Sequence, residues 1–150
     1  MLVDWGIFMG VLNLSFKVVP IEKKDLLEIN KILIKEIGSS QLPHLKECLR
    51  NGLAKKMVVE NKIAGFCLAF EYKTHFSLSY YYIYEEHRKK LQSGFFFFYC
   101  LNKMKSKQIQ VEKNKNLNLY KRYFYETPNG STLIFKGLRE GYEWAEILAK

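Results

Sequence analysis

The stretch Ser77–Gly94, SLSYYYIYEEHRKKLQSG, decides the fold, because it joins a strand to a helix through a basic turn. Its first half, Ser77–Tyr84, is rich in tyrosine, and aromatic residues favour β-strands. The following segment, Leu91–Lys107, has the length of a helix of about four turns and a lysine-rich end. We therefore predict a helix there in spite of the aromatic run Phe95–Phe98, and a β-α unit with a basic connection, His87–Lys90.

Two further strands are predicted immediately before Ser77, as a hairpin. Lys56–Glu60 and Lys62–Tyr72 flank Asn61, a residue type that tolerates the positive φ of a tight turn. Together with Ser77–Tyr84 they make three consecutive antiparallel strands. The middle of the chain is thus predicted to be a β-meander.

The N-terminal part of the chain predicts one strand and two helices. Leu14–Val19 alternates apolar and polar residues, which is typical of a strand. Glu22–Ile37 carries apolar residues at the helical period, and Gly38 stands where helices commonly end. Pro43–Asn51 predicts a second, short helix that is closed by Gly52.

The C-terminal part predicts a strand, a helix and a last strand. Gln108–Val111 is the first strand, Asn116–Tyr125 the helix, and Ser131–Gly137 the last strand after a turn at Thr127–Gly130. The complete order is β-α-α-β-β-β-α-β-α-β. It predicts an α/β (α+β) fold with a mixed, mostly antiparallel central sheet flanked by helices.

The chain of 150 residues has the length of one domain with its own core. We expect residues 1–13 to form an N-terminal extension, with Met9 as an alternative start of translation, and residues 138–150 to form a C-terminal tail. The aromatic residues Tyr142 and Trp144 in that tail suit pairing with a second copy, so a homodimer is left open.

The net charge of +9 suits an anionic partner: a phosphorylated cofactor, a nucleic acid or a membrane surface. The charge alone does not distinguish these three kinds of partner, and scattered lysines are also common on a solvated surface. The three cysteines form no CxxC pair, which favours free thiols in a reducing compartment and hence the cytoplasm. We expect no metal, because no cysteine and histidine cluster at metal-ligand spacing. We expect no membrane anchor, because the apolar N-terminal stretch is too short to span a bilayer.

The strand, turn and helix around Arg88 carry a family resemblance. Ile83 takes the apolar strand position, and Glu86, Arg88 and Lys90 fall in register with V-x-P-E-x-R-G-K-G-x-G-x-x-L. The hairpin Met57–Phe70 has the matching Gly-Phe pair, and Asn118–Lys121 resembles a helix that carries an active-site tyrosine. The chain thus resembles the GNAT superfamily of acyl-CoA-dependent N-acyltransferases from about Leu14 to Gly137.

The loop that binds the CoA pyrophosphate in that family is degenerate here. The family pattern is Q/R-x-x-G-x-G/A, and Arg88 matches its first position. Leu91 stands in place of the first glycine and Ser93 in place of the second small residue, while Gly94 comes one residue late. In helical conformation, Leu91 and Ser93 still offer backbone N–H groups to an anion at the positive end of the helix dipole.

The resemblance implies acetyl-CoA, or another acyl-CoA, as co-substrate. In the family the strand before the loop splays from its neighbour and pairs with the pantetheine arm, a role that falls to the strand ending at Tyr84. The residues assigned to the cofactor are Tyr82, Ile83, Tyr84, Arg88, Lys89, Lys90, Leu91, Gln92, Ser93, Gly94 and Asn116. The alternatives are a solvated basic helix start and strand tyrosines that only pack on helices.

The resemblance also implies the catalytic groups. Tyr120 would deliver a proton to the leaving CoA sulfur, which a phenol that is protonated at neutral pH can do. Glu71 would act as the base that takes the proton of the amine, with Glu85 as the alternative. The competing interpretations are a core aromatic for Tyr120 and exposed carboxylates for the two glutamates.

Three functions remain open at this stage. The first is an N-acyltransferase that acts on a primary amine of unknown identity. The second is a catalytically idle protein of the same fold that binds CoA or a partner, which the degenerate loop favours. The third is a small basic nucleic-acid-binding protein, which the charge favours although no nucleic-acid-binding motif is present.

Overall fold

The computed structural model describes residues 16–88, 90–112, 124–126 and 132–135. A seven-stranded sheet forms its centre, in the order β1-β2-β3-β4-β5-β7-β6. Neighbouring strands are antiparallel except β4 and β5, which are parallel. The strands are β1 (Lys17–Pro20), β2 (Gly52–Val59), β3 (Lys62–Glu71), β4 (His75–Ile83), β5 (Gln108–Glu112), β6 (Phe124–Glu126) and β7 (Thr132–Phe135). The predicted mixed, mostly antiparallel sheet is confirmed.

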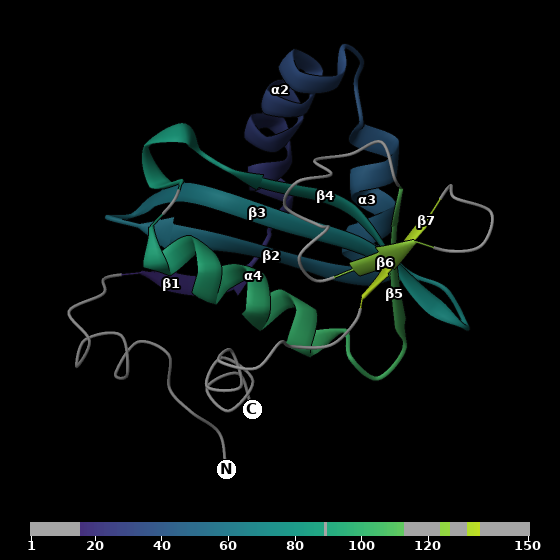
Figure 1. Cartoon of the computed structure of the whole chain (residues 1–150). Helices are drawn as coiled ribbons and strands as arrows, with labels where there is room; N and C mark the ends of the chain where they lie inside the picture. Colours follow the sequence, from purple (N-terminus) through teal and green to yellow (C-terminus); the bar gives the residue numbers. More distant parts are fainter. Residues whose placement is uncertain (1–15, 89, 113–123, 127–131, 136–150) are drawn as a thin grey trace.

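Helices cover both faces of this sheet. Helices α2 and α3 lie on one face, and α4 lies on the other (Figure 1). The helical segments are η1 (Lys23–Asp25), α2 (Leu26–Ile37), α3 (Leu42–Arg50), η2 (Glu85–His87) and α4 (Leu91–Lys103). The β-α-α start, the meander and the β-α-β unit that follows it are therefore arranged as the sequence predicts.

The core has two layers, because β3 is buried on both faces. Phe66 and Leu68 point into the layer under α2 and α3, whereas Cys67 and Ala69 point into the layer under α4. The four aromatic residues Phe95–Phe98 of α4 are all buried, so this helix is apolar on every side, as an interior helix is. Burying each phenylalanine contributes about 1.5–3 kcal/mol of hydrophobic free energy.

A buried ion pair fixes the start of α2 to the sheet. Lys56 Nζ lies 2.7 Å from Asp25 Oδ2, and both residues are less than a tenth exposed. The same carboxylate oxygen accepts a hydrogen bond of 2.8 Å from the backbone N–H of Glu22. Breaking such a pair leaves a buried charge without compensation, which makes both partners structurally important.

The turn and cap residues predicted from the sequence behave as expected. Gly38 ends α2 with φ of 99°, in the left-handed region that favours glycine. The β2–β3 turn has positive φ at both Glu60 and Asn61, 52° and 65°, which is the conformation of a type I′ hairpin. The predicted turn at Asn61 is confirmed, with Glu60 as its partner.

Among the predicted boundaries, the start of strand β2 and the end of helix α4 are wrong. Strand β2 begins at Gly52, because that glycine lies against β3, where an added Cβ would stand 1.9 Å from the carbonyl oxygen of Ala69. Helix α4 ends at Lys103, since the chain needs the residues up to Lys107 to return to β5.

The predicted helix Asn116–Tyr125 is wrong at its end, where Phe124–Glu126 forms β6. Phe124 and Tyr125 pair with β7, in keeping with the preference of aromatic residues for strands. The rest of that predicted helix, the turn at Thr127–Gly130 and both chain ends lie outside the described residues.

Candidate active site

The edge of β4 that faces β5 is paired over a short stretch. The parallel pairing runs from His75–Gln108 to Ser77–Gln110, and β5 then pairs with β7 on its other side. Strand β4 continues to Ile83 and pairs with β3 along its opposite edge. On the β5 side, no strand among the described residues is paired with β4 beyond Ser77. The two strands diverge in Figure 1. The divergence of β4 from β5 therefore begins at Ser77, the last residue of β4 in the described parallel pairing.

Strand β4 has a bulge just beyond the point where β5 leaves it. Leu68 pairs with Tyr80 and Ala69 pairs with Leu78, so Ser79 has no register partner on β3. A bulge breaks the alternation of side chains along a strand. As a result two successive side chains, Ser79 and Tyr80, both contact the elements on the α3 face.

A cluster of polar groups meets β4 at this bulge. His44, in the first turn of α3, places its Nε2 2.8 Å from Ser79 Oγ and 3.8 Å from Cys48 Sγ. The Tyr80 hydroxyl donates a 2.5 Å hydrogen bond to Gln41 Oε1. The backbone N–H of Gln41 in turn donates to Asn30 Oδ1 at 2.7 Å, which fixes the α2–α3 connection over the bulge.

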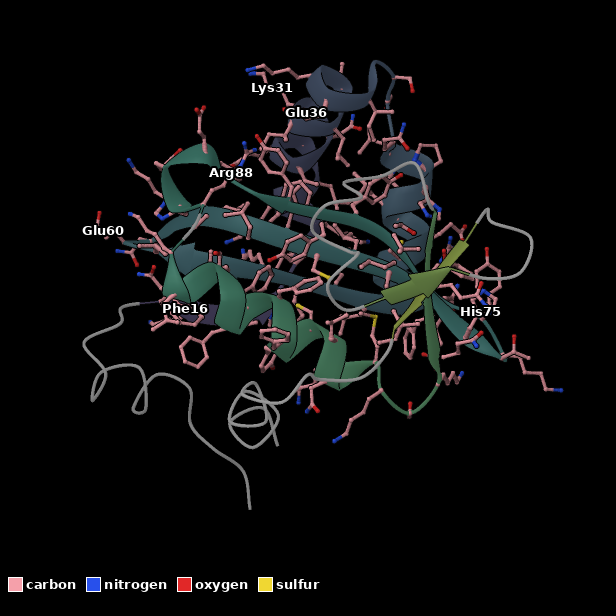
Figure 2. All side chains as sticks on the ribbon, in the orientation of Figure 1. Phe16, Lys31, Glu36, Glu60, His75 and Arg88 are labelled. Atoms are coloured by element: carbon pink, nitrogen blue, oxygen red, sulfur yellow. The ribbon has the colours of Figure 1, made fainter. Side chains whose placement is uncertain are left out.

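The opposite end of β4 leads into the basic turn. Arg88 Nε donates a 2.8 Å hydrogen bond to the carbonyl oxygen of Ile83, and its guanidinium carbon lies 5.1 Å from the centre of the Tyr82 ring. The side chain thus folds back on the end of β4 (Figure 2). Arg88 therefore holds the turn against the strand, in addition to the positive charge that it places there.

Helix α4 begins with its positive end close to this turn. Lys90 is the N-cap residue, Leu91, Gln92 and Ser93 form the first turn, and that turn contains no acidic residue. Leu91 and Ser93 have helical conformation. That conformation is needed for their backbone N–H groups to face an anion when the family's glycines are absent. An added Cβ at Gly94 would meet no atom within 4 Å, so this glycine is not needed for close packing. A basic N-cap opposes the helix dipole, which makes this end of the helix favourable for an anion.

Tyr81 of β4 and Tyr84, the residue after its end, pack against helices on opposite faces of the sheet. Tyr81 contacts Phe97 on α4, with ring centres 4.9 Å apart, and its hydroxyl donates to the carbonyl oxygen of Ser93 at 3.2 Å. The Tyr84 hydroxyl donates to the carboxylate of Glu28 on α2, and burial, aided by that carboxylate, raises the pKa of Tyr84. The side chains of these tyrosines thus hold β4 in place.

The structure places Glu71 away from the basic turn. Glu71 pairs with Phe76 at the β3–β4 hairpin end, and its carboxylate lies 2.7 Å from Lys107 Nζ. Figure 2 shows that His75, at this hairpin, and Arg88 lie at opposite ends of the sheet. Glu85 lies in η2, beside the basic turn. Of the other predicted site residues, Lys89, Asn116 and Tyr120 lie outside the described residues.

The sequence analysis missed the polar cluster at the bulge. His44 and Ser79 are 35 residues apart in the chain, and no spacing pattern relates them. A histidine in a short helix and a serine in an apolar strand are the signals that were present. Only the bulge brings them together, and register shifts are not visible in a single sequence.

Several solved structures are similar to this chain, whereas no protein-family model and no curated protein matches it. Naa50 of Arabidopsis thaliana, in complex with the bisubstrate analogue CoA-Ac-MVNAL, is 11% identical with a TM-score of 0.65, covering 83% of this chain and 100% of that chain. The PaiA N-acetyltransferase of Thermoplasma acidophilum, in complex with coenzyme A, is 12% identical with a TM-score of 0.57, covering 83% and 100%. A GNAT-family acetyltransferase of Bacillus cereus is 19% identical with a TM-score of 0.62, covering 83% and 99%. The chain therefore has the fold of the GNAT acetyltransferases.

In the described part of the chain, no helix is long and apolar enough to cross a membrane. No group of three or more histidine, cysteine, aspartate or glutamate side chains there is placed to hold a metal ion.

Proposed function

We propose that this protein is an N-acyltransferase that moves an acetyl or other acyl group from acyl-CoA to a primary amine. The observation that carries the proposal is the divergence of β4 from β5 beyond Ser77, on a strand that leads through the basic turn to the positive end of α4. The similarity to solved GNAT acetyltransferases, two of them in complex with CoA or a CoA analogue, supports it at the level of the fold.

The residues present suit the chemistry of CoA. Its pantetheine arm is extended and contains two amides, which can pair with backbone N–H and C=O groups along the edge of a strand such as β4. From Ser79 to Ile83 that edge is roughly 13 Å long, at about 3.3 Å per residue. The phosphates of CoA would then lie at the N-terminus of α4, near Lys90 and the backbone N–H groups of Leu91 and Gln92.

CoA supplies the activated thioester, and this chain would orient it and move protons. Backbone groups at the bulge of β4 would hold the acyl oxygen, which is where negative charge develops during transfer. Tyr120 would give a proton to the leaving sulfur, on the resemblance of Asn118–Lys121 to the family's active-site helix. The family resemblance also assigns Asn116 and Lys89 to contacts with the cofactor.

A turnover assay tests the proposal. The full chain is incubated with acetyl-CoA and a panel of amines comprising lysine, spermidine, an aminosugar and short peptides with free N-termini. Release of CoA thiol and the mass of each product are measured together. Thiol release with a product heavier by one acetyl group supports the proposal. Binding of acetyl-CoA without any acetylated product would favour the idle alternative.

That alternative, a CoA- or partner-binding protein without turnover, is supported by two observations. The guanidinium of Arg88 is engaged with Ile83 and Tyr82, and the carboxylate of Glu71 is engaged with Lys107 at the other end of the sheet. Each contact occupies a group to which the resemblance gives a role in the transfer. No structural observation favours nucleic-acid binding over these two functions.

A further inference from the structure

We infer that the protein recognises the phosphopantetheine part of its acyl donor and does not recognise the phosphorylated adenosine part. A thioester on phosphopantetheine alone, either free or attached to a carrier protein, then serves as donor as well as acyl-CoA does. The inference rests on the proposed function, and it names the chemical class of the donor for that function.

The first turn of α4 offers few backbone donors to an anion. The N–H of Ser93 already donates to the carbonyl oxygen of Lys90 at 3.1 Å, and the Ser93 hydroxyl donates to the same oxygen at 2.7 Å. Of the described residues in that turn, Leu91 and Gln92 are left to offer N–H groups. These two donors and the Lys90 ammonium group suit a single phosphate.

The basic turn before α4 uses its donors within the protein. The N–H groups of His87 and Arg88 donate to the carbonyl oxygens of Tyr84 and Glu85, at 2.9 and 3.2 Å. The Nε of Arg88 donates to the carbonyl oxygen of Ile83 at 2.8 Å. In the described part of the turn, these three donors are therefore not available to a second phosphate.

The side chains of Leu91 and Ser93 stand where the family pattern has small residues. The Cα–Cβ bonds of a helix are tilted toward its N-terminus, so both side chains lean toward the anion. Leu91 is 55% exposed, which places its apolar side chain at the surface of the first turn. Glycine lets a backbone approach a diphosphate closely, whereas a leucine side chain in its place keeps the second phosphate away. The phosphate of phosphopantetheine is therefore the one that this site holds.

Calorimetric titration of the full chain with three donors tests the inference. The donors are acetyl-CoA, acetyl-phosphopantetheine and acetyl-pantetheine, the last of which has no phosphate. We expect the first two to bind within about threefold of each other, and acetyl-pantetheine to bind at least about tenfold more weakly.

Two results of this titration would overturn the inference and leave the proposed function standing. One is acetyl-CoA that binds more than about tenfold more tightly than acetyl-phosphopantetheine, because the adenosine part would then be recognised. The other is equal binding of acetyl-pantetheine and acetyl-phosphopantetheine, because no phosphate would then be held. Failure of all three donors to bind would remove the proposed function together with the inference.

Glycine substitutions supply a second readout, which is a gain of binding. The Leu91→Gly, Ser93→Gly double variant should bind acetyl-CoA about tenfold more tightly, with acetyl-phosphopantetheine within about twofold, because only the diphosphate gains a close approach. Asn102→Gly is the matched control, since it loosens the last turn of the same helix, and it should change neither affinity. A folded double variant with the affinities of the intact chain would overturn the inference. If the double variant does not fold, the three donors on the intact chain still decide.

An acetylated carrier protein distinguishes the two sources of the thioester, because it holds the same phosphopantetheine arm on a serine. Binding of this protein more tightly than free acetyl-phosphopantetheine identifies the carrier protein as the source. Equal or weaker binding identifies the free thioester. Both results support recognition of the arm without adenosine.

Discussion

Arg88 Nε donates a hydrogen bond of 2.8 Å to the carbonyl oxygen of Ile83, the last residue of β4. This contact ties the basic turn to the strand whose edge we assign to CoA. Replacing Arg88 with lysine keeps the charge but removes the Nε donor and the planar group over Tyr82. We expect Arg88→Lys to lower the free energy of unfolding by about 1–2 kcal/mol, as measured in urea, because the hydrogen bond comes from a charged donor.

Measuring CoA binding distinguishes the two roles of Arg88, which are to position the basic turn and to supply a positive charge. If positioning dominates, Arg88→Lys should weaken binding nearly as much as Arg88→Ala. If the charge dominates, lysine should restore most of the affinity. An Arg88→Lys variant with unchanged stability would contradict the structural role of this contact.

The ion pair between Lys56 and Asp25 predicts a large loss of stability. Removing one partner leaves the other charge buried, so Lys56→Ala should cost about 3–5 kcal/mol in thermal or urea unfolding. Lys24→Ala is the matched control, because the Lys24 side chain is 74% exposed and its ion pair with Glu22 is long. We expect the control to change stability by less than about 0.5 kcal/mol. Similar effects of the two variants would contradict the burial of the Lys56 pair.

Gly65 allows β3 to lie close to the end of β4. An added Cβ would stand 2.9 Å from the carbonyl oxygen of Tyr82 and 2.6 Å from Ile83 Cδ1. The isoleucine methyl can turn away, but the carbonyl belongs to the backbone. Gly65→Ala should therefore destabilise the fold by about 1–3 kcal/mol and weaken CoA binding by displacing the end of β4.

Gly94→Ala provides the matched comparison for Gly65→Ala in unfolding experiments. Its added Cβ meets no atom within 4 Å, and alanine is the better helix former by up to about 1 kcal/mol. The substitution at Gly94 should leave stability unchanged or raise it. A destabilisation equal to that of Gly65→Ala would show that the close approach of β3 to Tyr82 is not the cause.

The buried thiol of Cys48 predicts a loss of stability in alkaline solution. Burial is the main reason that the pKa of this thiol rises from an ordinary 9.0 to about 11. Below pH 9 both the folded and the unfolded state keep the proton, so full stability is present. Between about pH 9 and 11 the unfolded thiol ionises while the folded one does not, and stability falls as pH rises.

Cys48→Ala isolates this contribution, because the raised pKa values of Cys100, Tyr84 and Tyr99 affect both proteins alike. The free energy of unfolding of the variant, measured in urea from pH 8 to 11, should fall less steeply than that of the intact chain. Parallel curves would mean that the thiol of Cys48 titrates alike in both states.

Much of the fold could be predicted because local signals agree with the final packing. Gly38 and Asn61 stand where positive φ is required, and the apolar period of the segment before Gly38 matches α2. The failures arise where tertiary contacts decide. Gly52 begins a strand although it follows a helix, and Phe124 joins β6 because β7 is beside it.

The candidate site was predictable only where its parts are close in the chain. The Ile83–Gly94 segment forms the predicted strand end, turn and helix start, since one short stretch contains all of them. Three other contacts join residues on different elements or depend on the direction of a side chain. They are Arg88 with the carbonyl oxygen of Ile83, Glu71 with Lys107, and His44 with Ser79. Residue types and spacing do not encode those contacts.

Titration of the purified protein with acetyl-CoA and CoA by isothermal calorimetry tests the central claim most directly. The Arg88→Ala, Lys90→Ala double variant is compared with Lys31→Ala, Lys35→Ala, which removes the same charge from the exposed side of α2. We expect micromolar binding by the intact chain and the control, and a loss of binding in the double variant. Absence of binding by the intact chain at millimolar CoA, or equal binding by both double variants, would contradict the assignment of the basic turn to CoA.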